Sequence, residues 1–289
     1  MGDSLVWIPG QTTVLGSDEH YPEEAPAREV TVDGFWIQTH QVTNAQYAQF
    51  VSATGYRTVA ERALNPADYP GAPPENLQPG SMVFRRTAGP VDLRHLSQWW
   101  QWTPGACWDH PRGPRSTTTG RDEHPVVHIA FEDAQAYAQW AGLGLPTEAE
   151  WETAARGGLS RATYTWSDEP ETTGQRLANY WHGEFPYLPD TGYGTTAPVG
   201  SFPANGYGLY DMAGNVWEWT TDFYGGDRAA TACCAEESVD PHFNIPRRVI
   251  KGGSFLCADS YCMRYRPAAR RPQQIDTGMS HLGFRCIRR

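Results

Sequence analysis

Glycine and proline recur along the whole chain, and this feature limits its fold more than any other. There are 29 glycines and 23 prolines among 289 residues, which leaves little room for long helices or long strands. The 12 tryptophans and 14 tyrosines supply large side chains that hold turn-rich layers together. No linker, charge block or fixed-period repeat divides the chain. We therefore predict one compact α+β domain over residues 1–289 with little regular secondary structure.

Three short helices are predicted, over residues 43–55, 132–142 and 147–157. The first and third begin with a capping box, in which a threonine is followed three residues later by Gln or Glu. All three end at a glycine, the residue that most often terminates a helix. Apolar residues recur at helical spacing within each segment.

Alternating apolar and polar residues predict strands and hairpins elsewhere. Residues 65–121 show neither period but are rich in Trp, Pro and Gly, so we expect ordered loops over a core or a cleft. The segments expected to contain strands are 6–17, 28–43, 164–170, 205–219, 248–255 and 281–289.

The net charge of −10 argues against sequence-independent nucleic-acid binding, which needs a basic face, and favours cationic ligands such as a peptide that carries arginine. No segment approaches the roughly 20 apolar residues of a membrane span, and no basic region precedes an apolar run at the start. We expect neither a membrane association nor export. The six cysteines are scattered, which favours reduced thiols and the cytoplasm.

Cys257 and Cys262 form the most suggestive cysteine pair. On a straight strand their side chains would point to opposite faces, and on a helix their directions would differ by about 140°, so only a bend brings the sulfurs together. If they meet, a redox disulfide and a soft ion such as Cu(I) are both open. Two buried residues that never meet are the alternative. The neighbouring arginines favour a thiolate.

Two further groups of polar residues are candidates for metal ligands. Asp211 and Glu218 flank a Gly-Asn turn and carry the oxygen donors that Ca²⁺ prefers, and an ordinary turn with solvated acids is the alternative. His124 and His128 are spaced like zinc ligands on a helix, but Pro125 favours an extended segment on which the two rings share a face, and we favour hydrogen-bonded structural histidines.

The adjacent pair Cys233 and Cys234 is a poor joint ligand, because neighbouring side chains on extended backbone diverge. The sequence contains no nucleophile elbow, phosphate-binding loop or dinucleotide fingerprint.

Four motifs together resemble the formylglycine-generating enzymes: GGSFLCADSYCMRYRPAAR, NGYGLYDMAGNVWEW, LPTEAEWETAARGG and the closing HLGFRC. The resemblance implies a compact fold distantly like C-type lectins. It also implies a copper-dependent oxidase that converts the cysteine of a CxPxR motif in an unfolded sulfatase polypeptide to Cα-formylglycine, with O₂ and a thiol reductant. Cys257 and Cys262 would bind the Cu(I).

The resemblance also assigns roles to other positions. Besides Cys257 and Cys262, the catalytic residues would include Ser254 and Trp217, and the substrate would contact Tyr261 and His281. A structural calcium would be bound by Asp211, Gly214, Val216 and Glu218, and a second calcium would involve Asn179 and Tyr180.

This chain departs from the vertebrate members of that family in three respects. The vertebrate members have two structural disulfides, which join four cysteines. Three of those four positions carry Ala138, Ala155 and Pro267 here, and the fourth is Cys286, which is left unpaired. The loss of both disulfides fits a reducing compartment. Ala258 replaces a histidine. The second calcium loop, near residues 190–194, is shortened.

Two other functions compete with the oxidase. A non-catalytic peptide- or ligand-binding module of the same fold would not need the cysteine pair, which is present here. The related sulfoxide synthases carry a separate helical domain with a His-rich iron motif, and this chain has neither.

Overall fold

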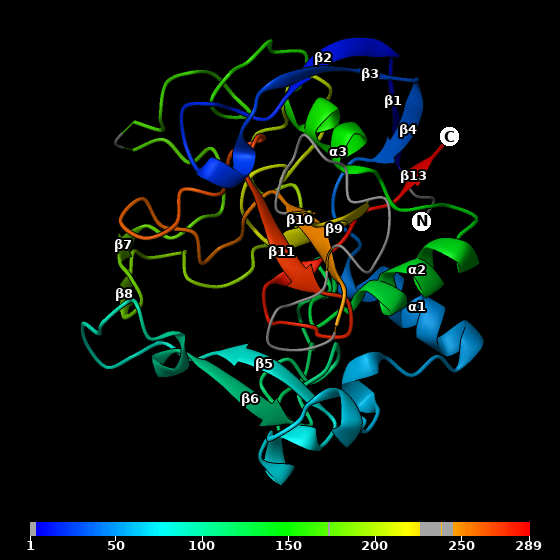
Figure 1. The fold of residues 1–289 in the computed structure, drawn as a ribbon, viewed down its shortest axis with the longest axis vertical. Coiled ribbons are helices and arrows are strands. Elements are labelled where there is room, and N and C mark those ends of the chain that lie inside the picture. Colours follow the sequence, from blue (N-terminus) through cyan, green and yellow to red (C-terminus); the bar gives the residue numbers. More distant parts are fainter. Residues whose placement is uncertain (1–3, 173, 226–237, 239–244) are drawn as a thin grey trace.

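The structure is a computed structural model that describes residues 4–172, 174–225, 238 and 245–289. Within this part of the chain the α-helices are α1 (Asn44–Thr54), α2 (Phe131–Trp140) and α3 (Glu148–Ala155). In Figure 1, α3 lies above the central strands β9, β10 and β11, and α1 and α2 lie to their right. The predicted capping boxes of α1 and α3 are both present, so all three helix predictions are confirmed.

The central sheet has the order β11-β10-β9-β12. Strand β9 pairs antiparallel with β10 and parallel with β12, so the chain returns from its C-terminal part to the middle of the fold. The bounds of these strands are β9 Trp217–Phe223, β10 Arg247–Lys251, β11 Arg270–Gln274 and β12 Leu282–Gly283.

The remaining strands form a second sheet and three two-stranded ribbons. The second sheet, of order β1-β4-β13, joins the two ends of the described chain. The bounds are β1 Leu5–Ile8, β4 Phe35–Gln38 and β13 Ile287–Arg288 for that sheet, and β2 Gln11–Leu15 with β3 Arg28–Val32, β5 Gly80–Phe84 with β6 Trp100–Pro104, and β7 Gly183–Glu184 with β8 Leu188–Pro189 for the ribbons. Short 3₁₀ turns, η1 to η5, cover Pro22–Glu24, Val59–Glu61, Pro66–Asp68, Pro74–Leu77 and Leu96–Gln98.

Three expectations about strands need correction. Residues 164–170 form turns and no strand, because the Tyr164 N–H donates to the Ser167 carbonyl (2.9 Å) and closes the segment locally. Residues 205–216 form turns, bends and one isolated bridge at Gly214, so only the end of the predicted segment 205–219 is a strand. Conversely, strands β5 and β6 lie inside the region expected to be loops; Figure 1 shows them as a hairpin set apart from the central sheet.

The carboxylate of Glu218 on β9 connects four segments of the fold. Both of its oxygens accept from the Arg285 guanidinium (2.7 and 2.8 Å), and they also accept from Trp151 Nε1 of α3 (2.7 Å) and Gln41 Nε2 (2.9 Å). Glu218 and Arg285 are fully buried. A buried ion pair is stable only when its remaining hydrogen-bonding groups are satisfied, and here two further donors complete the carboxylate.

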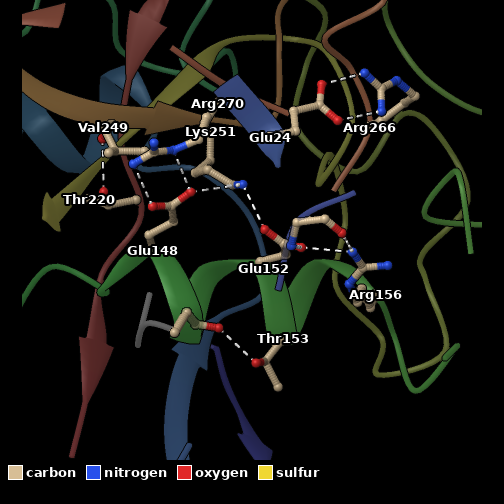
Figure 2. Close-up of polar contacts among 12 residues, drawn as sticks. Glu24, Glu148, Glu152, Thr153, Arg156, Thr220, Val249, Lys251, Arg266 and Arg270 are labelled. Carbon is tan, nitrogen blue, oxygen red and sulfur yellow. Dashed lines mark hydrogen bonds and ion pairs between the residues drawn. The ribbon is translucent and has the colours of Figure 1, made fainter. Parts of the chain in front are cut away.

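A second buried charge network lies beside the central sheet (Figure 2). Lys251 Nζ of β10 contacts Glu152 (2.9 Å) and Glu148 (3.5 Å) of α3. Glu148 also accepts from Arg270 of β11, and Glu152 from Arg156. The alternation of cations and carboxylates holds α3 against β10 and β11, because none of these charges is left alone in a buried environment.

The two predicted structural histidines are hydrogen-bonded as expected, but their rings contact different partners. His124 Nδ1 lies 2.9 Å from Thr196 Oγ1. His128 Nδ1 lies 2.7 Å from Ser81 Oγ, and its Nε2 lies 2.9 Å from the Pro111 carbonyl. His128 has a φ of 63°, so the backbone turns there and the alternation of a straight strand is lost.

We predict that Glu218→Gln lowers the free energy of unfolding by about 3–5 kcal/mol, because it leaves the buried Arg285 guanidinium without a negative partner. Chemical denaturation followed by tryptophan fluorescence measures the change. Glu132→Gln is the matched control, since Glu132 pairs with Arg62 at the surface and such pairs contribute less than about 1 kcal/mol. If the two substitutions lowered the free energy of unfolding equally, the predicted stabilising role of Glu218 would be contradicted.

We also predict that His128 makes the fold sensitive to acid. Burial lowers the pKa of His128 from 6.5 to about 4, so below pH 6.5 the unfolded chain binds a proton that the folded chain does not. This contribution to stability is complete above pH 6.5 and is lost as the pH falls toward 4, by up to about 3 kcal/mol.

His128→Asn tests this prediction, because asparagine tolerates a positive φ and does not titrate. The variant should lose less stability than the wild type between pH 6.5 and 4 in denaturation experiments. His95→Asn is the control, because His95 is exposed; if it changed the pH dependence as much as His128→Asn, His128 would not be the responsible group.

Candidate active site

A cavity of about 340 Å³ lies between the central sheet and the β5–β6 region. Both members of the cysteine pair line it, together with Ser254, Trp217 and Tyr261. His281 completes the set, so all six residues expected at the catalytic and substrate-binding positions face one space. The rest of the lining is mostly apolar or aromatic: Met82, Leu96, Ser97, Trp99, Trp100, Phe185, Ile250, Leu256, Arg271, Pro272, Gln273 and Met279.

The two cysteine sulfurs converge because the chain turns twice between Ser254 and Cys262. The Cys257 N–H donates to the Ser254 carbonyl (2.9 Å), and the Cys262 N–H donates to the Ala258 carbonyl (2.6 Å). The Sγ atoms of Cys257 and Cys262 lie 3.6 Å apart, well beyond the ~2.05 Å of a disulfide. The spacing of the two cysteines predicted that their sulfurs could meet only if the chain bends, and the structure shows this bend.

The double glycine that precedes the pair permits a close approach of two backbone segments. Gly252 and Gly253 both have positive φ, of 91° and 72°. A Cβ on Gly253 would lie 2.7 Å from the Arg264 carbonyl oxygen, which is closer than two such atoms pack. Only glycine fits there, and the cysteine turn is thereby held against the segment that follows it.

The two thiols differ in their electrostatic environment. Burial raises the pKa of Cys257 well above its usual value. The hydrogen bond from Cys257 lowers the pKa of Cys262 to about 6, and the positive charges of Arg271 and Arg264 act in the same direction. Arg264 Nη1 lies 3.7 Å from Cys262 Sγ. At neutral pH the pair is therefore a thiol that donates to a thiolate.

Aromatic rings form the walls beside the thiols. Tyr261 stacks on Phe185 with ring centroids 4.8 Å apart and meets the edge of Trp99. Trp217 is buried in the same apolar cluster as both cysteines. Rings at these positions exclude water from the sulfurs and leave a dry surface for an apolar or extended ligand.

His281 is buried on the cavity wall, with its ring 4.8 Å from that of Trp100. Its Nδ1 has no hydrogen-bond partner among the described residues. Burial lowers the pKa of His281 to about 3, so the imidazole is neutral and offers one unsatisfied ring nitrogen to a ligand.

The donor set of the cysteine pair fits a soft ion of low coordination. Two buried sulfurs 3.6 Å apart are both within reach of one ion, since metal–thiolate bonds are about 2.3 Å long. In the part of the chain that the structure describes, no group of three or more His, Cys, Asp and Glu side chains converges. Thiolates as the available ligands favour Cu(I).

The predicted calcium ligands fit an ion only in part. Asp211 is buried, its Oδ2 accepts from the Gly200 N–H (2.8 Å), and its Oδ1 has no partner among the described residues. Burial raises the pKa of Asp211 to about 6. Glu218, in contrast, already accepts from Arg285. Asn179, expected at the second calcium, also has an unpartnered buried Oδ1.

The other cysteines do not join the cavity. Cys107 and Cys286 are buried and form no disulfide among the described residues, and burial raises the pKa of Cys107 to about 12. The absence of a disulfide at Cys286 agrees with the alanine and proline substitutions. Cys233 and Cys234 lie outside the described residues.

Several lining residues were not singled out from the sequence. Met82, Leu96, Trp99 and Trp100 belong to the 65–121 region, and its high aromatic content was the one available signal. Arg271, Pro272 and Gln273 lie on β11 and line the cavity. Nothing in the sequence of this strand indicated that it borders the site.

Comparison with known proteins shows a match to the family described as "Sulfatase-modifying factor enzyme 1-like domain" over residues 1–289. The chain is 56% identical to the formylglycine-generating enzyme of Mycobacterium tuberculosis, covering 98% of this chain and 97% of that protein. It is 46% identical to the formylglycine-generating enzyme of Thermomonospora curvata, covering 98% and 92%.

Among solved structures, PvdO from Pseudomonas aeruginosa matches with a TM-score of 0.64 at 24% identity, covering 98% of this chain and 93% of that one. This likeness concerns the fold alone, and it confirms the predicted fold class: a compact α+β domain with little regular structure. No helix in the described part of the chain has the length and apolar character needed to cross a membrane.

We predict that a mild oxidant such as diamide joins Cys257 and Cys262 in an intramolecular disulfide, since their sulfurs need to approach by only about 1.5 Å. Peptide mapping by mass spectrometry under non-reducing conditions would show the cross-linked peptide. Cys107 and Cys286 should stay alkylatable after unfolding. A disulfide to either of them, or no loss of thiols, would show that the pair does not have this proximity.

Proposed function

The chain belongs to the formylglycine-generating enzyme family, and on that premise we propose that it oxidises the cysteine of a CxPxR motif in an unfolded sulfatase to Cα-formylglycine. Members of this family are oxidoreductases that act on peptidyl cysteine. We further propose that the reaction uses Cu(I), O₂ and a thiol reductant. The observation that carries the proposal is the buried pair Cys257 and Cys262, whose sulfurs lie 3.6 Å apart in the cavity wall.

Cys257 and Cys262 would hold the Cu(I), which when bound supplies the one-electron chemistry that O₂ requires. Soft thiolates stabilise the reduced ion. The thiolate of Cys262 provides the negative charge, and the guanidinium of Arg264 balances it at 3.7 Å. Arg264 is itself held by Glu23, with 2.5 Å between Nη2 and Oε1, so its position relative to the sulfur is fixed from the far side.

The remaining lining residues would bind the substrate and exclude water. Tyr261 and Trp217 place ring faces beside the sulfurs, and an extended peptide in the cavity would lie against them. Ser254 Oγ lies at the base of the cysteine turn, where it accepts from the Leu256 N–H (3.2 Å) and keeps its own O–H free to donate to a ligand. His281 offers its unsatisfied Nδ1.

The overall reaction balances with these partners. The substrate cysteine loses two electrons and its sulfur leaves as hydrogen sulfide when the oxidised carbon is hydrolysed to an aldehyde. Two molecules of thiol reductant lose two more electrons and become a disulfide. O₂ accepts all four electrons, and the net product besides aldehyde, sulfide and disulfide is one water.

Three further features are proposed. A structural calcium near Asp211 is supported by the unpartnered buried Oδ1 of that residue, with Gly214 and Val216 as carbonyl donors. Asn179 and Tyr180 remain the candidates for a second ion. The cytoplasm is proposed as the compartment, because Cys107, Cys257, Cys262 and Cys286 form no disulfide among the described residues.

We predict that the Cu(I)-loaded protein converts the cysteine of the peptide ALCTPSR to an aldehyde under air with a thiol reductant, and that Cys257→Ser and Cys262→Ser each abolish turnover. Mass spectrometry of the peptide measures the conversion, and copper titration measures loading. Cys107→Ser is the matched control, since Cys107 lies outside the cavity and should leave turnover unchanged.

Serine variants that kept the wild-type rate would remove the cysteine pair from the reaction. A folded wild-type protein that binds no Cu(I) and converts no peptide would instead support the non-catalytic binding module. Thermal denaturation of all three variants shows whether lost turnover reflects lost folding.

A further inference from the structure

Arg271 is the one permanently charged residue among the described residues that line the cavity. It lies on β11 opposite Ile250 of β10, and Ile250 also faces the cavity. Adjacent strand residues point to opposite faces. Accordingly, Arg270 points away from the cavity and pairs with Glu148 (Figure 2), whereas Arg271 points into it.

Unlike the Arg270 side chain, the Arg271 side chain makes no hydrogen bond or ion pair with any residue that the structure describes. The fully buried arginines each have a carboxylate partner; they are Arg156 with Glu152, Arg266 with Glu24, Arg270 with Glu148, and Arg285 with Glu218. Arg271 is only partly exposed. A half-buried guanidinium beside an apolar wall has lost part of its hydration without gaining a carboxylate partner.

Arg271 lines the same cavity as Cys257 and Cys262. A substrate cysteine bound beside that pair would therefore share the cavity with the guanidinium. The cavity volume is only about 340 Å³, and a peptide advances at most about 3.3–3.6 Å per residue, so only residues within about two positions of that cysteine would fit in the cavity with it.

We propose that Arg271 is a specificity-determining residue that binds an acidic side chain located within two positions of the cysteine to be modified. This inference rests on the proposed function and defines its substrate class more narrowly. Arginine recognises a carboxylate through two parallel hydrogen bonds, and the peptide would thereby supply the partner that the protein lacks. The arginine of the CxPxR motif, a like charge, is directed away from this end of the cavity.

Paired peptides test the proposal. In ALCTPSR, the residue two before, one before or one after the cysteine is replaced by Asp or, as the isosteric neutral control, by Asn. At one of these positions we expect kcat/KM for the Asp peptide to exceed that for the Asn peptide roughly tenfold at low salt, as a charge-assisted hydrogen bond implies. The ratio should fall with increasing ionic strength.

Variants of the protein locate the effect. Arg271→Gln should reduce the Asp-to-Asn ratio to about one, and Arg271→Lys should retain part of it because the charge remains. Arg121→Gln is the matched control: Arg121 is also half-buried and has no acidic partner among the described residues, but it lines a separate cavity. This variant should keep both the basal activity and the full ratio.

Three outcomes would overturn the proposal. One is a ratio near one at every position while the wild type converts ALCTPSR; another is a ratio that Arg271→Gln leaves unchanged. The third is a preference for anionic over neutral thiol reductants that Arg271→Gln removes, with no preference among peptides, which would assign the guanidinium to the reductant.

Failure to convert ALCTPSR at all would count against the proposed function. The dissociation constants of the Asp and Asn peptides, measured by calorimetry, still report the ratio in that case. If Arg271→Gln does not fold, two other measurements test the proposal: the Asp-to-Asn ratio of Arg271→Lys, and the salt dependence of this ratio in the wild type.

Discussion

The buried carboxylate of Glu218 is the interaction on which the positions of the other elements depend. Strand β9 carries Trp217 and Trp219 on one face, in the same apolar cluster as the cysteine pair, and Glu218 on the other. Because Glu218 is bound by Arg285, Trp151 and Gln41, the strand can neither slide nor rotate without leaving a buried charge uncompensated. The hydrogen bonds of Glu218 on the opposite face of β9 therefore hold Trp217 in its place in the cavity wall.

The cavity itself combines an apolar lining with an excess of positive charge near its sulfurs, although the chain as a whole carries −10. The charges of Arg264 and Arg271 both lower the pKa of Cys262. In a dry environment an isolated thiolate is costly, and these guanidinium groups offset that cost. The two arginines differ in one respect: Arg264 is already balanced by Glu23, so only Arg271 retains a charge that a ligand could neutralise.

The sequence predicted the features that depend on neighbours along the chain. The capping boxes at Thr43 and Thr147 define helix starts through contacts three residues apart, and both were predicted correctly. The convergence of Cys257 and Cys262 could be stated only as a condition, because spacing shows that a bend is necessary but not that it occurs. The double glycine at 252–253, which permits the bend to pack, gave supporting information.

Features that depend on partners far along the chain could not be predicted in this way. Glu218 was interpreted as a calcium ligand from its place beside a turn, and its partner Arg285 lies 67 residues away. Strands β5 and β6 escaped detection because their pairing joins residues about 20 apart without an alternating pattern. The family resemblance identified those cavity residues that match the family's motifs, but it assigned no role to Arg271.

Strand β11 illustrates how the structure distinguishes residues that look equivalent in the sequence. Arg270 and Arg271 are identical in type and adjacent in sequence, so no property of the residues themselves separates them. The pleat of the strand sends one guanidinium to a buried carboxylate and the other into the cavity. The first charge is satisfied by the fold and the second is not. The fully buried arginines of the described chain have carboxylate partners. The guanidinium of Arg271 has none and lines the cavity, so it marks a place where a ligand can supply the missing carboxylate.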